Sequence, residues 1–460
     1  MALKSIALAT LLLTLWYSNV ASASDRPNIL LINIDDMGWR DVGFMGTDFY
    51  ETPHLDAIAS DSLVFTNAYA GAANCAPSRA CLLSGQTTPR HRIFNVGTHP
   101  RGKEKNRLCE HIPGVDVLDT KIVTWAKLIQ DAGYRTGTIG KWHLSQDPRP
   151  YGFDVNVAGT QSGSPPRGHY PPHPGVGLDD AAEDEYLTDR LTDEAIKFIR
   201  ESACEPWLLY LPHFAVHTPL DAKRELLAKY KAKSPGKLHD HVAMATMIQS
   251  VDDGIGRLLT TLGELKMREN TLIVFTSDNG GYGPATDMDP LKGYKGTYYE
   301  GGIRVPFFVH WSGKIKSGRS DEPIAQIDLY PTFCALLGIS PPEGQPLDGV
   351  NLLPLWTGQV PALPKRSLFW HFPAYLESYR NCVDEQRDPL FRSRPVGVIR
   401  QGDWKLMEFF ESGDLELYHL TDDIGETSDL SASHPEKRDE LHAELKAWRA
   451  AVDAPVPRRK

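Results

Sequence analysis

Two apolar segments of strand character, Ile29–Ile34 and Leu272–Thr276, each end in residues with oxygen-bearing side chains. In an open α/β sheet, ligands bind beyond the carboxyl ends of the strands, so we expect these side chains to meet at one site. Carboxylate and amide oxygens without Cys or His suit Ca²⁺ or Mg²⁺ rather than zinc, and a flexible set of about seven ligands favours Ca²⁺. The alternative is that both pairs only cap or turn the chain. The residues are Asp35, Asp36, Asp278 and Asn279.

A second group of reactive residues lies between Asn74 and Gly85. Pro77 fits the first turn of a helix that ends by Gly85, so Cys75 is expected just before the helix N-terminus. Free N–H groups and the helix dipole favour an anion there. Arg79 lies one turn further along the same face, which adds a guanidinium to the nucleophile position. If the C-x-P-x-R pattern has no function of its own, the alternative is that Cys75 is a buried apolar thiol and Arg79 is a surface cation.

Two more apolar segments, Arg135–Ile139 and Trp207–Leu211, also run into polar residues at their carboxyl ends. One such placement has little meaning, but four strands that end in this way predict a shared site. The polar residues are Lys141, His143, His213 and His217.

The elements that must position these residues alternate between strands and helices. Helical patterns cover Lys121–Asp131, Asp189–Glu201 and Asp240–Leu265. This alternation predicts an α/β fold in which a large, mostly parallel sheet is sandwiched by helices.

The pattern changes after about residue 364. Three short strands with turns between them predict an antiparallel meander, and a final helix is expected over Pro435–Ala451. The strands are Val396–Arg400, Trp404–Phe410 and Leu415–Leu420. The predicted divisions are a signal peptide at residues 1–23, a catalytic domain at 24–365 and a smaller C-terminal subdomain at 366–460.

Composition and the N-terminus limit the class of protein. The 460 residues include 49 Lys and Arg against 59 Asp and Glu, a formal net charge of −10, which disfavours binding to a nucleic acid backbone. Met1–Ala23 has the pattern of a secretory signal, with Lys4, a short apolar run and small residues before the cleavage point. We expect a periplasmic or secreted protein with no membrane span after signal cleavage; an uncleaved anchor is the alternative. The six cysteines permit disulfides there, but no pairing is favoured.

The segment Cys75–Arg79, followed by Leu82–Gly85, resembles the signature of the type I, formylglycine-dependent sulfatases, which belong to the alkaline phosphatase-like superfamily. Ser84 and Ser145 depart from the family pattern, and neither change removes a reactive group. Further matching segments are Gly133–Thr136 with Gly140–Leu144, Gly293–Thr297 with Glu300–Pro306, and Leu417–Leu420 with Gly425–Thr427. The resemblance, to bacterial carbohydrate sulfatases and arylsulfatases, spans nearly the whole mature chain.

The resemblance implies a role for each site residue. A maturation enzyme would oxidise Cys75 to formylglycine (3-oxoalanine), and one hydroxyl of the hydrated aldehyde would attack sulfur. His217 would protonate the departing alcohol with help from Lys295, and His143 would deprotonate the second hydroxyl to release sulfate. His213 is interpreted as structural. The implied Ca²⁺ ligands are Asp35, Asp36, Asp278, Asn279 and the residue at position 75. The implied neutralising cations are Arg79, Lys141 and Lys295.

We therefore expect sulfate ester hydrolysis, with sulfated carbohydrate as the substrate. The segment His217–Leu220 followed by Asp221–Lys223 looks similar to carbohydrate sulfatases of bacterial polysaccharide degraders. Two loops, Ser162–Gly177 and Pro373–Pro395, are candidates for sugar contacts. Their candidate residues are Arg167, His169, His173, Arg380 and Arg392. The alternatives are a phosphonate or phosphodiester hydrolase of the same superfamily and a catalytically inactive protein that binds sulfated glycans.

Overall fold

The structure is a computed structural model that describes residues 26–165, 167–178, 182–379 and 388–460. The predicted signal peptide, Arg380 and Cys382 lie outside the described residues. Within the described part of the chain, no helix is long and apolar enough to cross a membrane.

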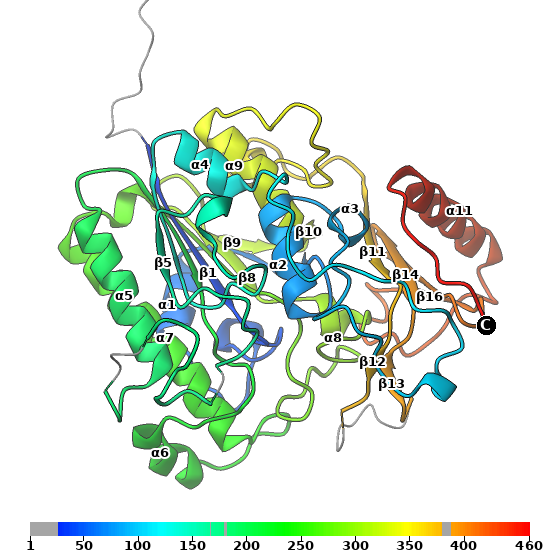
Figure 1. The fold of residues 1–460 in the computed structure, drawn as a ribbon, viewed down its shortest axis with the longest axis horizontal. Helices are drawn as coiled ribbons and strands as arrows, with labels where there is room; N and C mark the ends of the chain where they lie inside the picture. The colour runs from blue at the N-terminus through cyan, green and yellow to red at the C-terminus, as the bar shows by residue number, and fades with distance from the viewer. Residues whose placement is uncertain (1–25, 166, 179–181, 380–387) are drawn as a thin grey trace, which may run out of the picture.

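The largest sheet among the described residues has eight strands in the order β5-β4-β6-β1-β7-β8-β2-β9 (Figure 1). Strand β1 pairs in parallel with β6 and β7, while β8 runs antiparallel to β7 and β2. The strands are β1 (Asn28–Ile34), β2 (Leu63–Phe65), β4 (Arg135–Ile139), β5 (Val155–Val157), β6 (Trp207–Pro212), β7 (Thr271–Ser277), β8 (Phe307–His310) and β9 (Gly318–Ser320). The predicted α/β fold with a mostly parallel sheet is confirmed.

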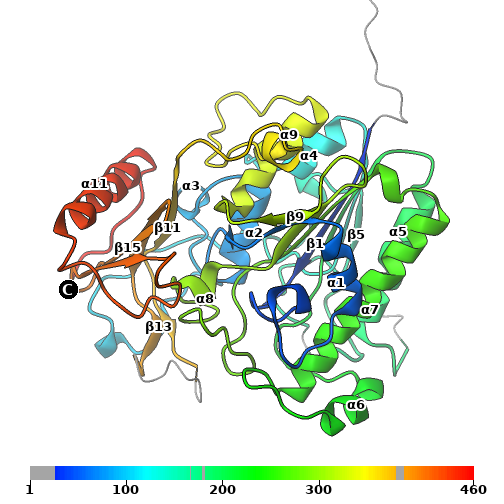
Figure 2. The ribbon, with the colours of Figure 1, turned by 180° about the vertical axis from the view of Figure 1, so that it is seen from behind.

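Successive residues of β1 face two different helical layers, as expected of a strand buried on both sides. Leu30 and Ile32 pack in a core with α1, α5 and α7, whereas Ile29 and Leu31 pack in a core with α2, α4 and α9 (Figures 1 and 2). The helices are α1 (Pro53–Ser60), α2 (Cys75–Ser84), α4 (Trp125–Asp131), α5 (Leu187–Glu201), α7 (Val242–Glu264) and α9 (Leu329–Leu337). Helices therefore cover both faces of the sheet whose strands end at the predicted site residues.

Local signals explain where the helices begin. Helix α7 follows His241, whose side chain accepts a hydrogen bond from the backbone N–H of Met244. The helix predicted over Lys121–Asp131 begins only at Trp125, because the side chain of Thr124 caps it by accepting from Lys127 N. The predicted start was therefore four residues too early.

The C-terminal part of the described chain forms a four-stranded antiparallel sheet in the order β11-β14-β15-β16, which confirms the predicted meander. Sequence analysis missed β11, which pairs with β14. It also missed a two-stranded sheet, β12 with β13, inside the segment predicted as a loop at Pro373–Pro395. The strands are β11 (Ser367–Phe372), β12 (Leu376–Glu377), β13 (Phe391–Ser393), β14 (Val396–Gln401), β15 (Trp404–Phe409) and β16 (Leu415–His419).

Helix α11 (Pro435–Ala451) covers this sheet on the side away from α5 and α7 (Figure 1). Leu441 and Leu445 pack against Leu406, and Trp448 stacks on Phe369 with ring centroids 4.6 Å apart. The predicted division at residue 365 stays a prediction. The remaining strands and α-helices of the described chain are β3 (Ala68–Tyr69), β10 (Ile324–Ala325), α3 (Thr88–His91), α6 (Leu227–Ala232), α8 (Glu300–Ile303) and α10 (Leu353–Trp356).

Candidate active site

The strand register brings the predicted site residues to one edge of the large sheet. Ile34 of β1 lies opposite Ser277 of β7, so the residues that follow each strand are neighbours. Strands β4 and β6 continue the same edge on the other side of β1. The site residues therefore lie beyond the carboxyl ends of parallel strands, which is where open α/β sheets bind ligands.

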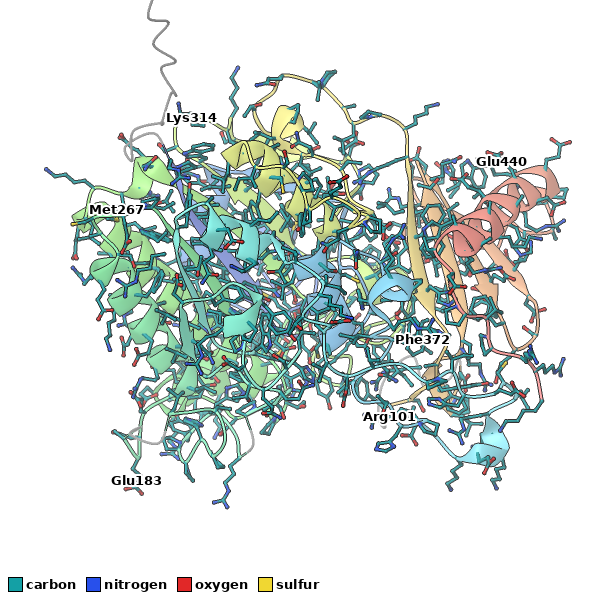
Figure 3. The ribbon with its side chains drawn as sticks, turned by 45° about the horizontal axis from the view of Figure 1, so that its top comes forward. Arg101, Glu183, Met267, Lys314, Phe372 and Glu440 are labelled. Atoms are coloured by element: carbon teal, nitrogen blue, oxygen red, sulfur yellow. The ribbon has the colours of Figure 1, made fainter. Side chains whose placement is uncertain are left out.

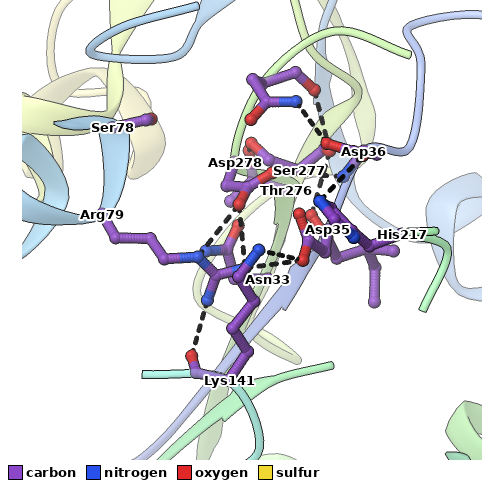
Figure 4. Close-up of polar contacts among 12 residues, drawn as sticks. Asn33, Asp35, Asp36, Ser78, Arg79, Lys141, His217, Thr276, Ser277 and Asp278 are labelled. Atoms are coloured by element: carbon purple, nitrogen blue, oxygen red, sulfur yellow. Dashed lines mark hydrogen bonds and ion pairs between the residues drawn. The ribbon is translucent and has the colours of Figure 1, made fainter. Parts of the chain in front are cut away.

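One half of the site is an ion-pair network around Asp278. The Arg79 guanidinium lies 2.8 Å from Asp278 Oδ2 through Nη2 and donates from Nη1 to the Lys141 carbonyl at 2.7 Å. Lys141 in turn pairs with Asp35. Figure 4 shows Arg79 and Lys141 reaching these carboxylates from one side, while His217 approaches Asp36 from the other. All four members of this network are buried.

The other half is built around Asp36, whose φ of 60° lies in the left-handed region that strains a side-chain-bearing residue. Its carboxylate accepts from Asn279 Nδ2 at 2.8 Å and from Lys295 Nζ at 2.7 Å, and its backbone N–H donates to Asp278 Oδ1 at 3.2 Å. Burial raises the pKa of Asp36, but Lys295 and His217 outweigh burial and hold the pKa below its ordinary value. We call these seven residues the strand-end cluster: Asp35, Asp36, Asp278, Asn279, Arg79, Lys141 and Lys295.

Glycine permits the close approach that places Lys141. Gly140 has φ 123°, and a Cβ there would lie 2.0 Å from the Pro212 carbonyl oxygen. Lys141 N donates to that same carbonyl at 2.7 Å, so the turn after β4 is attached to the end of β6. Only a residue without a side chain allows this contact.

Cys75 is the first residue of α2, with Asn74 in extended conformation before it. The prediction that Cys75 precedes the helix was thus wrong by one residue, since Asn74 takes the N-cap position. The Cys75 side chain is buried and lies within 4.8 Å of ligand atoms on Asp35, Asp36 and His217. Burial raises the pKa of the thiol, but the ammonium groups of the strand-end cluster outweigh burial and hold the pKa well below its ordinary value.

His143 contacts the Cys75 thiol through its ring and also has a left-handed backbone, with φ 65°. A Cβ at Gly163 would lie 2.4 Å from the His143 ring, so the loop can cover this ring only with glycine there. Burial lowers the pKa of His143 to about 4, which keeps the imidazole neutral and able to accept a proton.

His217 lies at the solvent edge of the site, with 16% of its side chain exposed. Its Nδ1 is 2.7 Å from the Thr218 carbonyl, which can only accept, so Nδ1 carries a hydrogen and Nε2 is the nitrogen turned toward Asp36. Nε2 lies 3.7 Å from Asp36 Oδ2. His169 contacts the His217 carbonyl at 3.2 Å, whereas His213 is buried and burial lowers its pKa to about 4.

The strand-end cluster contains two buried oxygens that nothing in the described chain satisfies. Asp35 Oδ1 and Asn279 Oδ1 have no hydrogen-bond partner among the described residues. Unpaired buried oxygens are costly, and a hard cation satisfies them. The residues therefore fit an oxygen-ligated divalent cation.

The residues predicted to contact sugar lie in different environments. His169 and His173 are buried, so the proposed sugar contact was wrong for both: His169 supports the His217 backbone, and His173 lies inside the fold. Arg167 is exposed. Arg392 lies over the Tyr379 ring, 3.9 Å from the ring centroid, and packs against Gly296.

Sequence analysis missed residues that join the parts of the site. Gln326 donates to the Ser277 carbonyl at 2.6 Å and accepts from Ser78 at 3.1 Å, which ties α2 to the end of β7. No local pattern marks Gln326, because its partners are far away in the sequence. Asn74 was detectable, since an Asn before a helix start is a common N-cap.

Comparisons with known proteins agree with this geometry. The Sulfatase family model matches residues 27–339, and the model for the C-terminal part of N-sulphoglucosamine sulphohydrolase matches residues 294–451. The chain is 30% identical to a sulfatase of Formosa agariphila over 94% of this chain and 90% of that protein. It is 31% identical to N-acetylgalactosamine-6-sulfatase of Homo sapiens over 79% of this chain and 75% of that protein.

Two solved structures have similar folds. Ps i-CgsB is 30% identical, with a TM-score of 0.75 and 92% of each chain covered, and has also been solved in complex with k-i-k-neocarrahexaose. Phosphonate monoester hydrolase of Agrobacterium radiobacter is 21% identical, with a TM-score of 0.67 over 95% of this chain and 100% of that one. The second likeness concerns the fold alone.

Proposed function

This chain belongs to the sulfatase family and is a sulfuric ester hydrolase, and from that premise we propose that it cleaves sulfate esters of carbohydrates with formylglycine at position 75 and a bound Ca²⁺. The observation that carries this proposal is the pair of unsatisfied oxygens, Asp35 Oδ1 and Asn279 Oδ1, in the cluster beside Cys75. An under-satisfied acidic cluster next to a buried nucleophile position is suited to a cation that binds an anionic substrate.

Charge supports a role for the cation. Three carboxylates of the strand-end cluster face three cationic side chains, so the cluster is balanced before any ion binds. A Ca²⁺ held by Asp35, Asp36, Asp278 and Asn279 supplies the excess positive charge that a sulfate ester needs. Arg79, Lys141 and Lys295 are already fixed by ion pairs, so they require little reorganisation when the anion arrives.

Formylglycine supplies a hydrated aldehyde, with one hydroxyl to attack sulfur and a second to release sulfate. The residues around position 75 divide the proton transfers. His143, neutral at pH 7 and in contact with the position 75 side chain, accepts a proton there. His217 holds its Nδ1 hydrogen on Thr218, so the proton that goes to the leaving alcohol would come from Nε2 of the protonated, imidazolium form, at the solvent edge.

The proposal that the substrate is a carbohydrate depends on the similar proteins. N-acetylgalactosamine-6-sulfatase and Ps i-CgsB, each at least 30% identical, are named for or complexed with carbohydrates. The phosphonate hydrolase is more distant in sequence. We therefore favour a sulfated sugar over a phosphonate or phosphodiester.

Three measurements test the proposal together. Mass spectrometry of the Cys75 peptide from the native host should show formylglycine, and metal analysis should show calcium that chelation removes together with activity. Turnover of nitrophenyl sulfate should exceed turnover of nitrophenyl phosphate and phenyl phosphonate esters. An unmodified thiol in active enzyme would refute the formylglycine nucleophile. Zinc in place of calcium would refute the proposed metal, and a preference for the phosphorus esters would refute the proposed substrate.

A further inference from the structure

We propose that two tyrosine hydroxyls at the entrance of the active site, those of Tyr282 and Tyr379, bind hydroxyl groups of the sugar whose sulfate is removed. The inference deepens the proposed function and rests on it. Tyr282 follows the strand-end cluster along the chain, three residues after Asn279. Tyr379 comes from the C-terminal part of the chain, after β12. We call Tyr282 and Tyr379 the entrance tyrosines.

The backbone places Tyr282 beside Lys295. Lys295 N donates to the Gly281 carbonyl at 2.9 Å, and Tyr282 is the next residue after Gly281. The Lys295 side chain reaches into the strand-end cluster, where its Nζ lies 2.7 Å from Asp36 Oδ2. The same short segment that holds Lys295 in place therefore also carries the first of the entrance tyrosines.

Tyr379 reaches the same place from the other side of Lys295. The rings of the entrance tyrosines meet edge to face, with their centroids 5.0 Å apart. Arg392 lies over the Tyr379 ring, 3.9 Å from its centroid. Arg392 also packs against Gly296, the residue after Lys295, where a Cβ would lie 2.3 Å from Arg392 Nε. These contacts form a closed path that begins and ends at Lys295.

The packing of the C-terminal sheet explains how Tyr379 arrives there. In Figure 3, Phe372 at the end of β11 lies nearer to the large sheet than Glu440 of α11 does. The Phe372 ring packs against Tyr298, with ring centroids 5.4 Å apart. The chain then runs through β12 to Tyr379. The C-terminal part of the chain therefore contributes a side chain to the active-site entrance.

The entrance tyrosines are accessible, unlike the residues beneath them. Both rings and Arg392 are partly exposed, whereas the strand-end cluster is buried. Burial raises the pKa of Tyr379, although Lys295 and Arg392 oppose the rise, so the phenol keeps its proton at neutral pH. Asp36 and Cys75 also raise this pKa, because the phenol oxygen lies within their electrostatic reach. A ligand bound at these hydroxyls therefore lies next to the reacting groups.

The chemistry of the entrance tyrosines fits a sugar. A phenol hydroxyl both donates and accepts a hydrogen bond, as a sugar hydroxyl does. Arg392 and Tyr294, whose ring centroid is 5.7 Å from that of Tyr379, hold the Tyr379 ring in place. A site that hydrogen-bonds a hydroxyl of its substrate discriminates against an ester that lacks this hydroxyl. The entrance tyrosines therefore favour a sulfated sugar over an aryl sulfate.

The experiment uses the full-length, mature enzyme and compares sugar sulfates with nitrophenyl sulfate. The sugar sulfates are the methyl galactosides with a single sulfate at C2, C3, C4 or C6 and a carrageenan hexasaccharide. Tyr379→Phe and Tyr282→Phe each remove one hydroxyl and keep the ring. In at least one of these variants, the ratio of kcat/KM for the best sugar sulfate to kcat/KM for nitrophenyl sulfate should fall about threefold to tenfold.

Deoxygenated substrates show whether the lost contact is made to the sugar. Each hydroxyl of the best sugar sulfate is removed in turn. Removal of the hydroxyl that a tyrosine binds should lower kcat/KM of the unaltered enzyme by a similar factor, and it should have little further effect in the variant that lacks this tyrosine hydroxyl. Independent, additive losses for every deoxygenated sugar would contradict a direct contact.

Tyr330→Phe is the matched control. It removes a hydroxyl that donates to the Val123 carbonyl at 2.9 Å, and Tyr330 packs against Gly85, at the opposite end of α2 from Cys75. The inference is overturned if both entrance variants keep the ratio as Tyr330→Phe does, or if the enzyme cleaves nitrophenyl sulfate and no sugar sulfate. Absence of turnover of every sulfate ester by the unaltered enzyme would instead refute the proposed function.

Discussion

Two of the buried clusters of charged side chains among the described residues have similar compositions and different surroundings. One is the strand-end cluster, and the other, the Glu300 cluster, joins α8 to the C-terminal sheet. In the Glu300 cluster, Glu300 accepts from Tyr69 at 2.6 Å and pairs with Lys405 at 2.9 Å and Arg304 at 3.0 Å. Glu426 pairs with Lys405 at 2.8 Å and accepts from Glu300 N at 2.7 Å.

The two clusters use similar side chains and differ in how completely they satisfy them. Every carboxylate oxygen of Glu300 and Glu426 has a cation or donor within 3.0 Å, although Glu426 Oε1 has only the Lys405 ion pair and no hydrogen bond among the described residues. In the strand-end cluster, Asp35 Oδ1 and Asn279 Oδ1 have none among the described residues. A closed set of ion pairs holds parts of a fold together, whereas a set with open oxygens is prepared for a ligand. The Glu300 cluster therefore stabilises the fold, whereas the strand-end cluster is prepared to bind a ligand.

The largest expected effect separates activity from stability at Cys75, beside the strand-end cluster. Cys75→Ala should lower sulfatase kcat at least about 10⁴-fold, because it removes the nucleophile position. The free energy of unfolding should change by only about 1 kcal/mol. The measurements are nitrophenyl sulfate turnover and the Tm, with Cys334→Ala, a buried thiol in α9, as the control that keeps activity. Residual turnover above trace level in Cys75→Ala would show that the reaction does not require Cys75.

The next effect distinguishes the two histidines beside Cys75. His217→Ala should reduce kcat about 10² to 10⁴-fold on a sugar sulfate and far less on nitrophenyl sulfate, because a nitrophenolate leaves without a proton. His143→Ala should impair both substrates, since sulfate release is the same whichever alcohol has left. The test is kcat for each variant on each substrate. Equal losses on both substrates for His217→Ala would mean that the roles are assigned wrongly.

The third prediction breaks the Glu300 cluster. Lys405→Met leaves Glu300 and Glu426 buried without their shared cation and should lower the free energy of unfolding by about 3 to 5 kcal/mol. The fraction that remains folded should keep turnover within several-fold. Urea unfolding measures the change, and Lys446→Met, an exposed lysine on α11, should stay within about 0.5 kcal/mol of the parent. A large activity loss at unchanged stability would place this cluster in the chemistry.

The smallest effect is a pH dependence of stability. Burial raises the pKa of Glu426 from 4.5 to about 7, although Lys405 opposes the shift. The folded state therefore holds a proton that the unfolded state has released, so stability falls as pH rises from about 4.5 through 7. The loss is at most about 3 kcal/mol. Unfolding at pH 5 and pH 8 measures it, and Glu426→Gln should flatten the difference. Stability that rises over this range in the parent would contradict the assignment.

Much of the strand-end cluster was predictable because its residues follow recognisable elements. Asp35 and Asp36 directly follow β1, Asp278 directly follows β7, and the strand-end rule puts such residues together without knowledge of any contact. Lys295 lies outside every strand, and only its resemblance to a family motif marked it. The Glu300 cluster was not predicted at all, since its members are brought together by the packing of α8 against β15.

The sequence by itself determined the α/β architecture, the strand ends and the residue types that meet there, because periodicity and motif are local properties of the chain. Tertiary structure decided how each group is satisfied. The left-handed backbone at Asp36 and His143, and the open oxygens of Asp35 and Asn279, depend on partners far away in the sequence. Long-range packing, rather than local pattern, determines which buried polar atoms remain open to a ligand.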